Sequence, residues 1–341
     1  MDKENYIKTI KGKFSFEEIH EFLEKSRDLK ILMIGDTILD EYFFVQPKGR
    51  AIKDPILSVE FHSSEVYPGG ILAIANHISS YVKEATLVTL LGDNHKDFVE
   101  KSLAKNIKTK YFIKKGCQTT VKRRYIDSYK NNKLFKVEFM DDKPLGEEPT
   151  SQIIKYLGGE LLKYDMVLVA DFGHGFINNE IRSIIQLKSK YIALNVQTNS
   201  ANMGYNYVNN YKRADFVVMS QEEIRLAVAM AYDEIEHVVR RFYNMLKFRE
   251  FIVTIGRSGC VYCNKGKLIK APALSDHIVD TVGAGDAVLT VTSLMSYLGA
   301  DEALIPFIAN CTGAIKIGIM GNKESVSKVK LLNFIRELYE K

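Results

Sequence analysis

The feature that most constrains the fold is an alternation of short apolar runs with amphipathic, helix-like segments along most of the chain. A bounded apolar run of about four to eight residues is typical of a buried strand, and an apolar period of about 3.6 residues is typical of a helix. Strands that alternate with helices form mainly parallel sheets, because the crossover helices cover both faces. We therefore predict an α/β fold with three layers and a mainly parallel central sheet. The expected strands lie at 30–35, 85–94, 161–171, 191–196, 214–220 and 251–256, and the expected helices at 178–190, 221–235, 237–247, 284–299, 301–320 and 327–341.

Two segments, at 41–64 and about 109–140, break this alternation. Apolar and polar residues alternate in these segments, which are interrupted by sequences typical of turns, such as the Lys-Asn-Asn-Lys run at 130–133. This pattern is typical of antiparallel strands that are exposed on one face. We expect the two segments to pair as a small β lid over a crevice, and ordinary edge hairpins are the alternative.

The chain of 341 residues has no internal repeat and no linker rich in Pro, Gly or Ser, which favours one continuous domain. Residues 15–27 are typical of an amphipathic helix, with Ser15 and Glu18 in the spacing of a capping box. We predict an N-terminal extension with this helix at 1–29 and a single α/β domain at 30–341.

Charge and cysteine content narrow the class of protein. The net charge of +5 is small and scattered, so it disfavours a dedicated nucleic-acid binder, whereas a mildly basic cleft for a phosphorylated substrate fits it. No apolar run approaches the roughly 18 residues that span a membrane, and the first residues lack a secretory signal. The four cysteines include one CxxC at Cys260 and Cys263, without the second pair that a zinc site needs. We expect reduced thiols in a cytoplasmic protein.

The strongest local signal for chemistry is the run Asp280-Thr281-Val282-Gly283-Ala284-Gly285-Asp286, which opens a long apolar helix. A helix N-terminus presents free amides to an anion, and small residues there let the backbone approach a ligand. An aspartate beside such an anion site suits a general base for a hydroxyl that attacks a phosphoryl group. The alternative is a glycine-rich N-cap in which Asp286 only complements the helix dipole.

This run resembles the signature of the ribokinase-like (PfkB) carbohydrate kinases, and three further motifs share the resemblance. They are the Gly-Asp-Thr-Ile-Leu-Asp run that ends at Asp40, the pair Gly69-Gly70, and the Thr-Ile-Gly-Arg-Ser-Gly run at 254–259. The resemblance covers about residues 30 to 337. It implies an ATP-dependent kinase that uses Mg²⁺, with a sugar or sugar phosphate as the acceptor. The apolar face of the expected lid strands indicates a homodimer.

The resemblance also implies roles for individual residues. Asp286 becomes the catalytic base, and the amides of Gly283, Ala284 and Gly285 hold the transferred phosphate. Asp40, Gly69 and Gly70 bind the sugar, with Asp171 as a further candidate for the same wall. Thr254, Gly256, Gly259, Ser220 and Asn310 lie by the nucleotide, Glu223 holds a magnesium-bound water, and Asp280 with Thr281 forms a monovalent-cation site, so that potassium is a candidate activator.

Within the family, several stretches resemble the kinase module of bacterial heptose-7-phosphate kinase, an enzyme often fused to a nucleotidyltransferase. They include KGRAIKDPILSVEF around Arg50, TTVKRRYI around Lys122, ADFGHGF around His174, and ANCTGAIKIGIMGNKESVS near the end. By this likeness the lid covers the sugar, and Arg50, Lys122, Arg123 and Arg124 are candidates to grip a substrate phosphate. A solvated strand face is the alternative for these four residues. A separate nucleotidyltransferase in the same pathway is a candidate partner.

Departures from the family pattern remove polar groups. Ala73 stands where sugar kinases carry an asparagine, and we do not assume that the nearby Asn76 replaces it. A serine, Ser220, opens the motif that usually reads NxxE, and a histidine, His174, replaces a lysine of the heptose kinases. The positions of an expected DxK motif are Asn195 and Gln197. Each lost charged hydrogen bond is worth about 1.5–3 kcal/mol. The alternatives are therefore a kinase for another sugar or a nucleoside, or a non-catalytic ligand-binding or regulatory protein.

Overall fold

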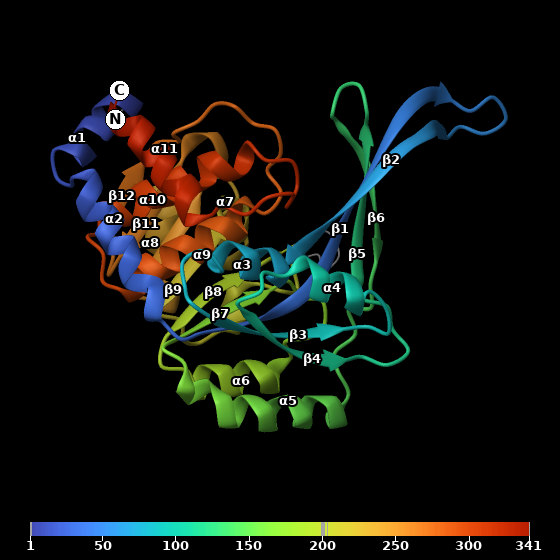
Figure 1. Ribbon diagram of the computed structural model, residues 1–341, viewed down its shortest axis with the longest axis horizontal. Coiled ribbons are helices and arrows are strands. Elements are labelled where there is room, and N and C mark those ends of the chain that lie inside the picture. The colour runs from blue at the N-terminus through green and yellow to red at the C-terminus, as the bar shows by residue number, and fades with distance from the viewer. Residues whose placement is uncertain (1, 199–201, 203, 341) are drawn as a thin grey trace.

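The computed structural model describes residues 2–198, 202 and 204–340. Its centre is a large twisted sheet with helices on both faces (Figure 1), as the alternation of strands and helices predicts. The strand order is β12-β11-β10-β9-β8-β7-β1-β3-β4, and neighbouring strands from β10 to β4 are parallel. The strands are β1 (Ile31–Arg50), β3 (Ala85–Leu91), β4 (Ile107–Ile113), β7 (Met166–Asp171), β8 (Ile192–Val196), β9 (Phe216–Ser220), β10 (Glu250–Thr254), β11 (Cys260–Asn264) and β12 (Lys267–Ala271).

Two hydrophobic cores lie on opposite faces of this sheet. In β1, Ile31 and Met33 pack into one core, and Leu32 and Ile34 pack into the other, because successive side chains of a strand point to opposite faces. The first core is covered by α1 (Lys3–Lys11), α2 (Phe16–Glu24), α3 (Ile71–Ile78), α4 (Lys96–Ser102), α9 (Ala284–Tyr297), α10 (Leu304–Ile317) and α11 (Lys328–Glu340). The second is covered by α5 (Glu147–Glu160), α6 (Asn179–Lys188), α7 (Gln221–Val228) and α8 (Ile235–Leu246).

The expected extension at 1–29 packs on the first core. Ser15 and Glu18 form the predicted capping box, in which Ser15 Oγ accepts from Glu18 N at 3.1 Å and Glu18 Oε2 accepts from Ser15 N at 2.7 Å. The side chains of Ile19 and Leu23 in α2 are buried. Both chain ends lie together beside α11 (Figure 1), where Tyr339 Oη donates to the carbonyl of Phe14.

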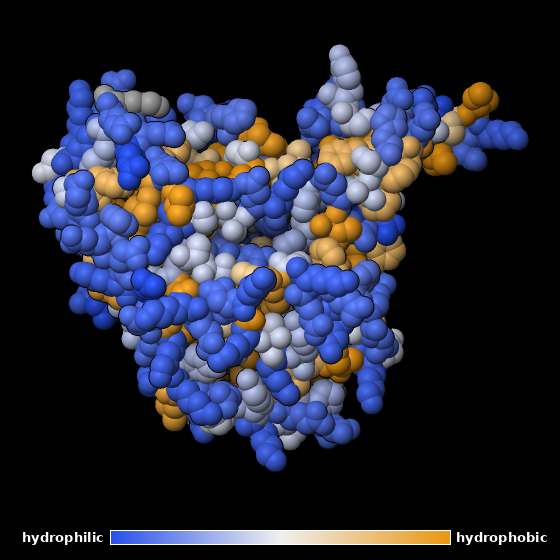
Figure 2. Space-filling view, in the orientation of Figure 1, coloured by the Kyte–Doolittle hydropathy of each residue, from blue (hydrophilic) through white to orange (hydrophobic). Residues whose placement is uncertain are grey.

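The lid is a second sheet that shares the long strand β1 with the central sheet. The strand β1 pairs with β3 through Ile31–Asp36, and beyond that it pairs with β2 (Leu57–Gly70) and β5 (Thr120–Asp127). Strand β6 (Lys133–Phe139) completes the lid beside β5. The β1–β2 hairpin projects away from the body, and apolar side chains gather along the lid strands (Figures 1 and 2). The exposed apolar side chains of the strands include Leu57, Phe61, Phe135 and Val137, and Ile52 and Ile56 are exposed in the loop between β1 and β2.

One lid boundary differs from the expectation. Residues 107–113 form β4, which pairs in parallel with β3 at the edge of the main sheet, so the second lid segment begins at Thr120. An edge strand is partly exposed, and it therefore shows the same alternation of polar and apolar residues as a lid strand.

Two negative findings concern the described part of the chain. None of its helices combines the length and the apolar character that crossing a bilayer requires. Its four cysteines are free thiols, and Cys260 and Cys263 are both buried in β11, where no metal cluster forms within residues 2–198, 202 and 204–340.

Candidate active site

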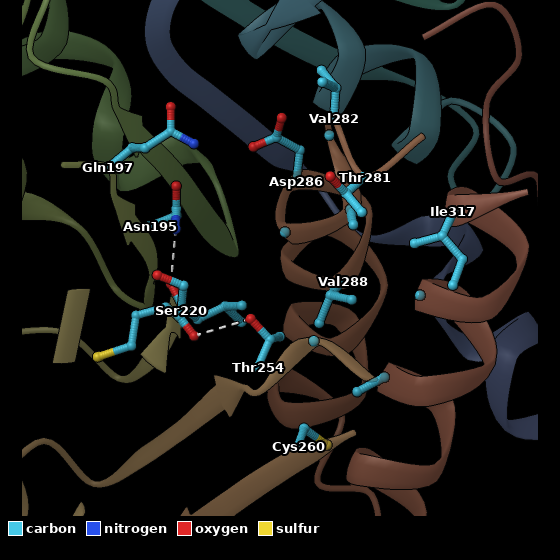
Figure 3. Close-up of a pocket in the computed structure, with 18 of the residues that line it drawn as sticks. Asn195, Gln197, Ser220, Thr254, Cys260, Thr281, Val282, Asp286, Val288 and Ile317 are labelled. Carbon is cyan, nitrogen blue, oxygen red and sulfur yellow. Dashed lines mark hydrogen bonds between the residues drawn. The ribbon is translucent and has the colours of Figure 1, made fainter. Parts of the chain in front are cut away.

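A cavity of about 900 Å³ opens where the carboxyl ends of the parallel strands face the lid and the start of α9. Ligands of open α/β sheets bind at this edge, because the loops and helix N-termini converge there. Asn195, Ser220 and Thr254 lie on one side of it, opposite Asp286 and Val288 of α9 (Figure 3). The sequence-predicted residues that line it are Asp40, Gly70, Lys122, Arg124, Ser220, Glu223, Thr254, Gly256, Gly259, Gly283, Ala284, Gly285, Asp286 and Asn310.

The start of α9 is shaped by Gly283. This residue is the N-cap with a φ of 76°, and a Cβ built on it would lie 2.5 Å from Asn322 Oδ1, so only glycine fits. The amide of Ala284 donates to Thr281 O at 3.3 Å. In the described part of the chain, the amides of Gly283 and Gly285 donate no hydrogen bond, and a Cβ on Gly285 would meet open space. These two residues line the cavity, so their amides are available to an anion there, as at the N-termini of other helices.

Asp286 stands in the first turn of this helix with its side chain almost entirely buried. Within the described residues its carboxylate accepts no hydrogen bond. Burial raises its pKa to about 7, and the negative charge of Asp40 adds to the increase, while the ammonium groups of Lys316 and Lys122 oppose it. A carboxylate with a pKa near neutral pH and no partner suits a general base.

The other end of the cavity is built around Asp40 on β1. Its Oδ1 accepts from Arg124 Nη1 at 2.5 Å, and its Oδ2 accepts from Asn322 Nδ2 at 3.3 Å. A Cβ on Gly69 would lie 2.3 Å from the same Oδ2, and Gly70 has a φ of 55° at the start of α3. Gly69 therefore leaves room for the carboxylate without lining the cavity, and Gly70 makes the turn that only glycine makes readily.

The four predicted basic residues separate into two groups. Lys122 is buried and Arg124 is partly buried on the cavity wall, and Lys122 Nζ lies 3.9 Å from Glu138 Oε1. Arg123 points to the opposite face, as the alternation of a strand requires, and its Nε donates to Glu41 Oε2 at 2.6 Å. Arg50 is exposed near the tip of the β1–β2 hairpin.

The expectation that Arg123 and Arg50 help to grip the substrate phosphate is not met within this chain, because neither lines the cavity in the described structure. Arg50 is ten residues beyond Asp40 on one continuous strand, which places it roughly 33 Å further along at about 3.3 Å per residue.

The 254–259 run, which the sequence predicts to bind the nucleotide, starts at the last residue of β10, and Ser220 ends the neighbouring strand β9. Gly256 has a φ of 52° and Gly259 a φ of 92°, and a Cβ on Gly259 would lie 2.1 Å from Ala271 O. Asn310 of α10 donates through Nδ2 to the same carbonyl at 3.1 Å and lines the cavity. Ser220 caps α7, with its Oγ accepting from Glu223 N at 3.2 Å. These residues form one wall of the cavity, and at the glycines this wall is made of backbone atoms.

Glu223 is the predicted holder of a magnesium-bound water. It lines the cavity, and its Oε2 accepts from Ser220 N at 2.7 Å. Burial raises the pKa of Glu223 to about 7. The described residues contain no cluster of three metal-ligating side chains, so they offer no protein cage for a metal. They fit Mg²⁺ that arrives with nucleotide phosphates and keeps its waters, since Mg²⁺ in phosphate sites needs only one or two carboxylates.

Asp171 does not join the sugar wall. It ends β7 and is buried outside the cavity, where its carboxylate accepts from Tyr211 Oη at 2.9 Å, Asn206 Nδ2 at 3.0 Å and Gly173 N at 3.1 Å. Arg182 Nη2 lies 3.5 Å from the same group. The expectation of a sugar contact is wrong for Asp171 because these partners turn its side chain away from the cavity.

Asp280 is buried beneath the start of α9 and does not line the cavity in the described structure. Its Oδ1 accepts from Lys133 Nζ at 2.5 Å and Val282 N at 3.1 Å. Its Oδ2 accepts from Tyr42 Oη at 2.7 Å and Gly321 N at 2.9 Å. An ionised carboxyl group has about four lone-pair sites, so none is left for a metal ion. The residues present do not fit a monovalent cation at Asp280.

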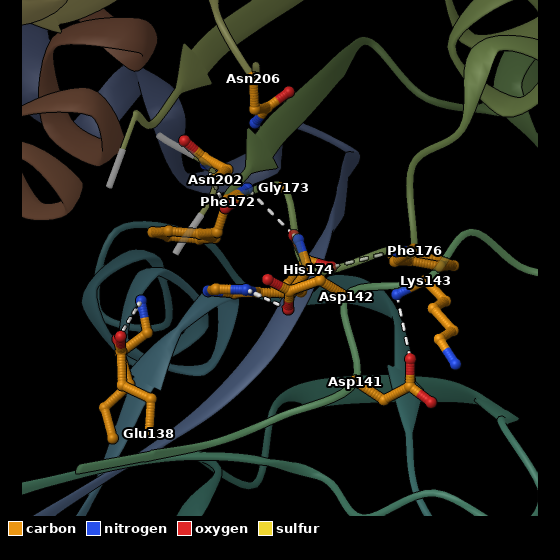
Figure 4. A network of polar contacts seen from close by, with 12 residues as sticks. Glu138, Asp141, Asp142, Lys143, Phe172, Gly173, His174, Phe176, Asn202 and Asn206 are labelled. Carbon is orange, nitrogen blue, oxygen red and sulfur yellow. Dashed lines mark hydrogen bonds and ion pairs between the residues drawn. The ribbon is translucent and has the colours of Figure 1, made fainter. Parts of the chain in front are cut away.

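Three of the departures from the family pattern lie on the cavity wall, and one of them is Ser220. Asn195 and Gln197 both line it, and Asn195 Nδ2 donates to Val218 O at 2.9 Å (Figure 3). His174 lies apart from the cavity, where its Nδ1 is 3.0 Å from Asp142 Oδ1 (Figure 4). Asn76 bonds to the backbone of residues 102 and 104, so it does not take the place of the asparagine that Ala73 lacks.

Sequence reasoning missed three residues around the site: Asn322, which bonds Asp40, and Lys133 and Lys316, which surround the start of α9. Lys316 carries a signal that could have been read, because it is the one charge in the otherwise uncharged run of α10. Asn322 and Lys133 lie in polar segments, where nothing in the sequence distinguishes them from surface residues.

Comparison with known proteins agrees with this geometry. The model of the pfkB family carbohydrate kinases matches residues 28–292. The bifunctional protein HldE of Helicobacter pylori is 24% identical over 302 residues, which cover 86% of this chain and 64% of the relative. HldE of Citrifermentans bemidjiense is 20% identical over 340 residues, which cover 93% of this chain and 69% of the relative. The chain thus spans about two thirds of the length of these relatives.

Solved structures share the fold. Phosphofructokinase-2 from Escherichia coli in complex with fructose-6-phosphate superposes with a TM-score of 0.72 at 13% identity, and the match covers 91% of this chain and 99% of that chain. The same enzyme in complex with potassium gives a TM-score of 0.71 at 14% identity over the same shares. Arabidopsis thaliana ribokinase with ribose and ATP gives 0.67 at 14% identity, again with 91% and 99% covered. With a family model that covers most of its length and a cavity at the expected sheet edge, the chain belongs to the pfkB family of carbohydrate kinases.

Proposed function

We propose that the protein is an ATP-dependent kinase that phosphorylates a hydroxyl of a sugar or sugar phosphate. One observation carries the proposal: Asp286, Gly283, Gly285 and Asp40 line one cavity, and within the described residues the Asp286 carboxylate accepts no hydrogen bond and the amides of the two glycines donate none. A general base beside an anion site, with a second carboxylate to orient the hydroxyl, is the arrangement that phosphoryl transfer requires.

The roles follow from the positions. Asp286 removes the proton of the attacking hydroxyl, and Asp40 and Gly70 orient the sugar against it. The amides of Gly283 and Gly285 stabilise the charge of the transferred phosphoryl group, and Ala284 joins them if its 3.3 Å bond to Thr281 O opens. The amides of Gly283 and Gly285 donate to no other group in the described structure, so little reorganisation of these two donors is needed when charge develops.

ATP would lie along the wall formed by Thr254, Gly256 and Gly259, with the base near Asn310 and the phosphates towards α9. The glycines favour this placement, because their φ angles bring the backbone to the cavity surface. Mg²⁺ would accompany the phosphates, with Glu223 holding one of its waters through a hydrogen bond. Bound Mg²⁺ supplies charge neutralisation on the phosphate oxygens.

The acceptor is proposed to be a phosphorylated sugar, with heptose 7-phosphate as the first candidate. Lys122 and Arg124 place two positive charges on the sugar side of the cavity, and a nucleoside would not need them. The similarity to HldE, together with the resemblance of several stretches to heptose-7-phosphate kinase, also favours a phosphorylated sugar. A homodimer through the apolar lid face, a separate nucleotidyltransferase partner and a cytoplasmic location stay predictions.

The decisive experiment measures ADP release from Mg-ATP across a panel of sugars, sugar phosphates and nucleosides that includes heptose 7-phosphate. We expect turnover with a phosphorylated sugar. Turnover only with a nucleoside would contradict the assignment of Lys122 and Arg124. Silence across the panel with ATP binding intact would favour a ligand-binding or regulatory role, for which the uncharged Asn195 and Gln197 on the cavity wall are the supporting feature.

The pH dependence provides a further prediction. Because burial raises the pKa of Asp286 to about 7 and the base must be ionised, kcat/KM should fall about tenfold per pH unit below neutral pH. Burial gives Glu223 a pKa near the same value. Glu223→Gln should therefore keep the acidic limb and move it to slightly lower pH, since one negative charge near Asp286 is lost. A profile that stays flat down to about pH 5 would contradict Asp286 as the base.

A further inference from the structure

The place beneath the start of α9 is where the family resemblance puts a monovalent cation, and a structure of phosphofructokinase-2 with the same fold is described in complex with potassium. In this chain the carboxylate that would hold the ion, Asp280, already accepts four hydrogen bonds. Asp280 therefore has no lone pair left to coordinate a metal ion. Another group must supply positive charge beneath the start of α9.

Lys316 supplies this charge. Its side chain is completely buried near the C-terminal end of α10. The Nζ atom donates to Val282 O at 2.6 Å and to Gly321 O at 2.7 Å. Within the described residues this ammonium forms no ion pair within 4.0 Å, and both of its hydrogen bonds go to backbone carbonyls. Carbonyl oxygens around a desolvated single positive charge are also the environment in which proteins bind potassium.

The two carbonyls belong to segments that matter for the reaction. Val282 precedes the N-cap Gly283, and Gly321 follows α10 and donates its own amide to Asp280. The Cε of Lys316 lies 3.3 Å from the position that a Cβ on Gly283 would occupy, so the lysine stem packs against the turn itself. One side chain thus ties the loop that presents the free amides to the loop after α10.

The surrounding charge favours a cation at this point. The carboxylates of Asp280, Asp286 and Asp40 all act electrostatically on Lys316, and Lys133 is the other cation nearby. Burial lowers the pKa of Lys316, and the three carboxylates oppose that decrease. Without the ammonium of Lys316, the carbonyls of Val282 and Gly321 would lose their hydrogen bonds to it. The three carboxylates would also lose part of the positive charge that balances them in this buried region.

We propose that the ammonium of Lys316 replaces the monovalent cation, so that nucleotide binding and turnover in this protein do not depend on potassium. The part that concerns turnover rests on the proposed kinase function. Lys316 acts as a positioning residue, because it holds the start of α9 in place without touching the reacting atoms.

The first test uses the unaltered protein. Its thermal unfolding midpoint and its affinity for Mg²⁺ with a non-hydrolysable ATP analogue are measured in potassium, sodium and choline chloride at equal ionic strength. We expect the same midpoint and affinity in all three salts. A saturable gain that only potassium produces, in either quantity, would overturn the proposal, because it would show a cation site that Lys316 does not fill.

The second test converts the site. Lys316→Ala removes the ammonium and leaves space beside the carbonyls of Val282 and Gly321. In choline chloride we expect a lower unfolding midpoint and about a tenfold or larger loss of nucleotide affinity. Potassium should restore both, and more effectively than sodium. A variant that behaves like the unaltered protein in choline, or a loss that potassium does not restore, would contradict the replacement.

Lys323→Ala is the matched control, since Lys323 is an exposed lysine in the following loop that pairs with Glu65 and does not line the main cavity. It should show no response to potassium. If Lys316→Ala does not fold, the salt comparison on the unaltered protein still decides. Neither readout requires a sugar, so a silent substrate panel would remove the kinase proposal while the unfolding midpoints continue to test Lys316.

Discussion

Asp286→Asn is expected to reduce phosphoryl transfer about 100- to 10,000-fold while ATP affinity stays nearly unchanged. Asparagine keeps the shape of the side chain at the start of α9 but cannot accept the proton of the sugar hydroxyl. The substitution also removes a buried carboxylate whose pKa is raised to about 7 by burial, so the protein should fold at least as well as before. Steady-state ADP release and calorimetric ATP binding measure the two quantities.

Asp97→Asn provides the matched control, because Asp97 also lies in the first turn of a helix, α4, but is exposed and outside the cavity. Turnover of this variant should equal that of the unaltered protein. If Asp286→Asn kept full turnover, the catalytic base would have to be another group. If it lost ATP binding and turnover together, Asp286 would belong to the nucleotide site instead.

Asp40→Ala is expected to raise the KM for the sugar by roughly ten- to a hundredfold and to leave the KM for ATP nearly unchanged, since a charged hydrogen bond is worth about 1.5–3 kcal/mol. It should also reduce stability by about 3–5 kcal/mol, because it leaves the guanidinium of Arg124 buried without its carboxylate. Chemical denaturation measures the second effect. Asp40→Asn keeps a hydrogen-bond acceptor and separates the sugar effect from a folding defect.

The chain offers a close control in Glu41→Ala. Glu41 follows Asp40 on β1 and Arg123 precedes Arg124 on β5, and the two form a carboxylate–arginine pair on the face that does not line the cavity. This variant should lose some stability and keep its KM for the sugar. Equal increases in the KM values for sugar and ATP in Asp40→Ala would place Asp40 outside the sugar site.

Much of this architecture could be predicted from local pattern. The apolar runs and helical periods predict the parallel sheet, and the Ser15 capping box forms as its spacing indicates. The glycine-rich run at 280–286 opens α9, with Gly283 in the left-handed conformation. These predictions succeed because strand burial, helix capping and glycine turns depend on residues close together in the chain.

The partners of the charged residues could not be predicted in the same way. Asp40 and Asp280 are both aspartates beside glycine-rich or turn segments, yet Asp40 faces the cavity and Asp280 is saturated by four donors. Similarly, Arg124 lines the cavity while Arg50 is carried to the tip of a hairpin. Which neighbour a side chain meets is decided by strand length and by loops far away in the sequence.

The sequence by itself determined the fold class and the glycine-rich motif that contains Asp286, because the fold class follows from local periodicity and the motif from glycines that favour a left-handed turn. The tertiary structure alone decided the electrostatics of the site. Asn322 reaches Asp40 across 282 positions of the chain, and Lys316 meets Val282 across 34. Burial raises the pKa of Asp286 only after these segments have closed around it, since desolvation is a property of the packed molecule and not of any one stretch of sequence.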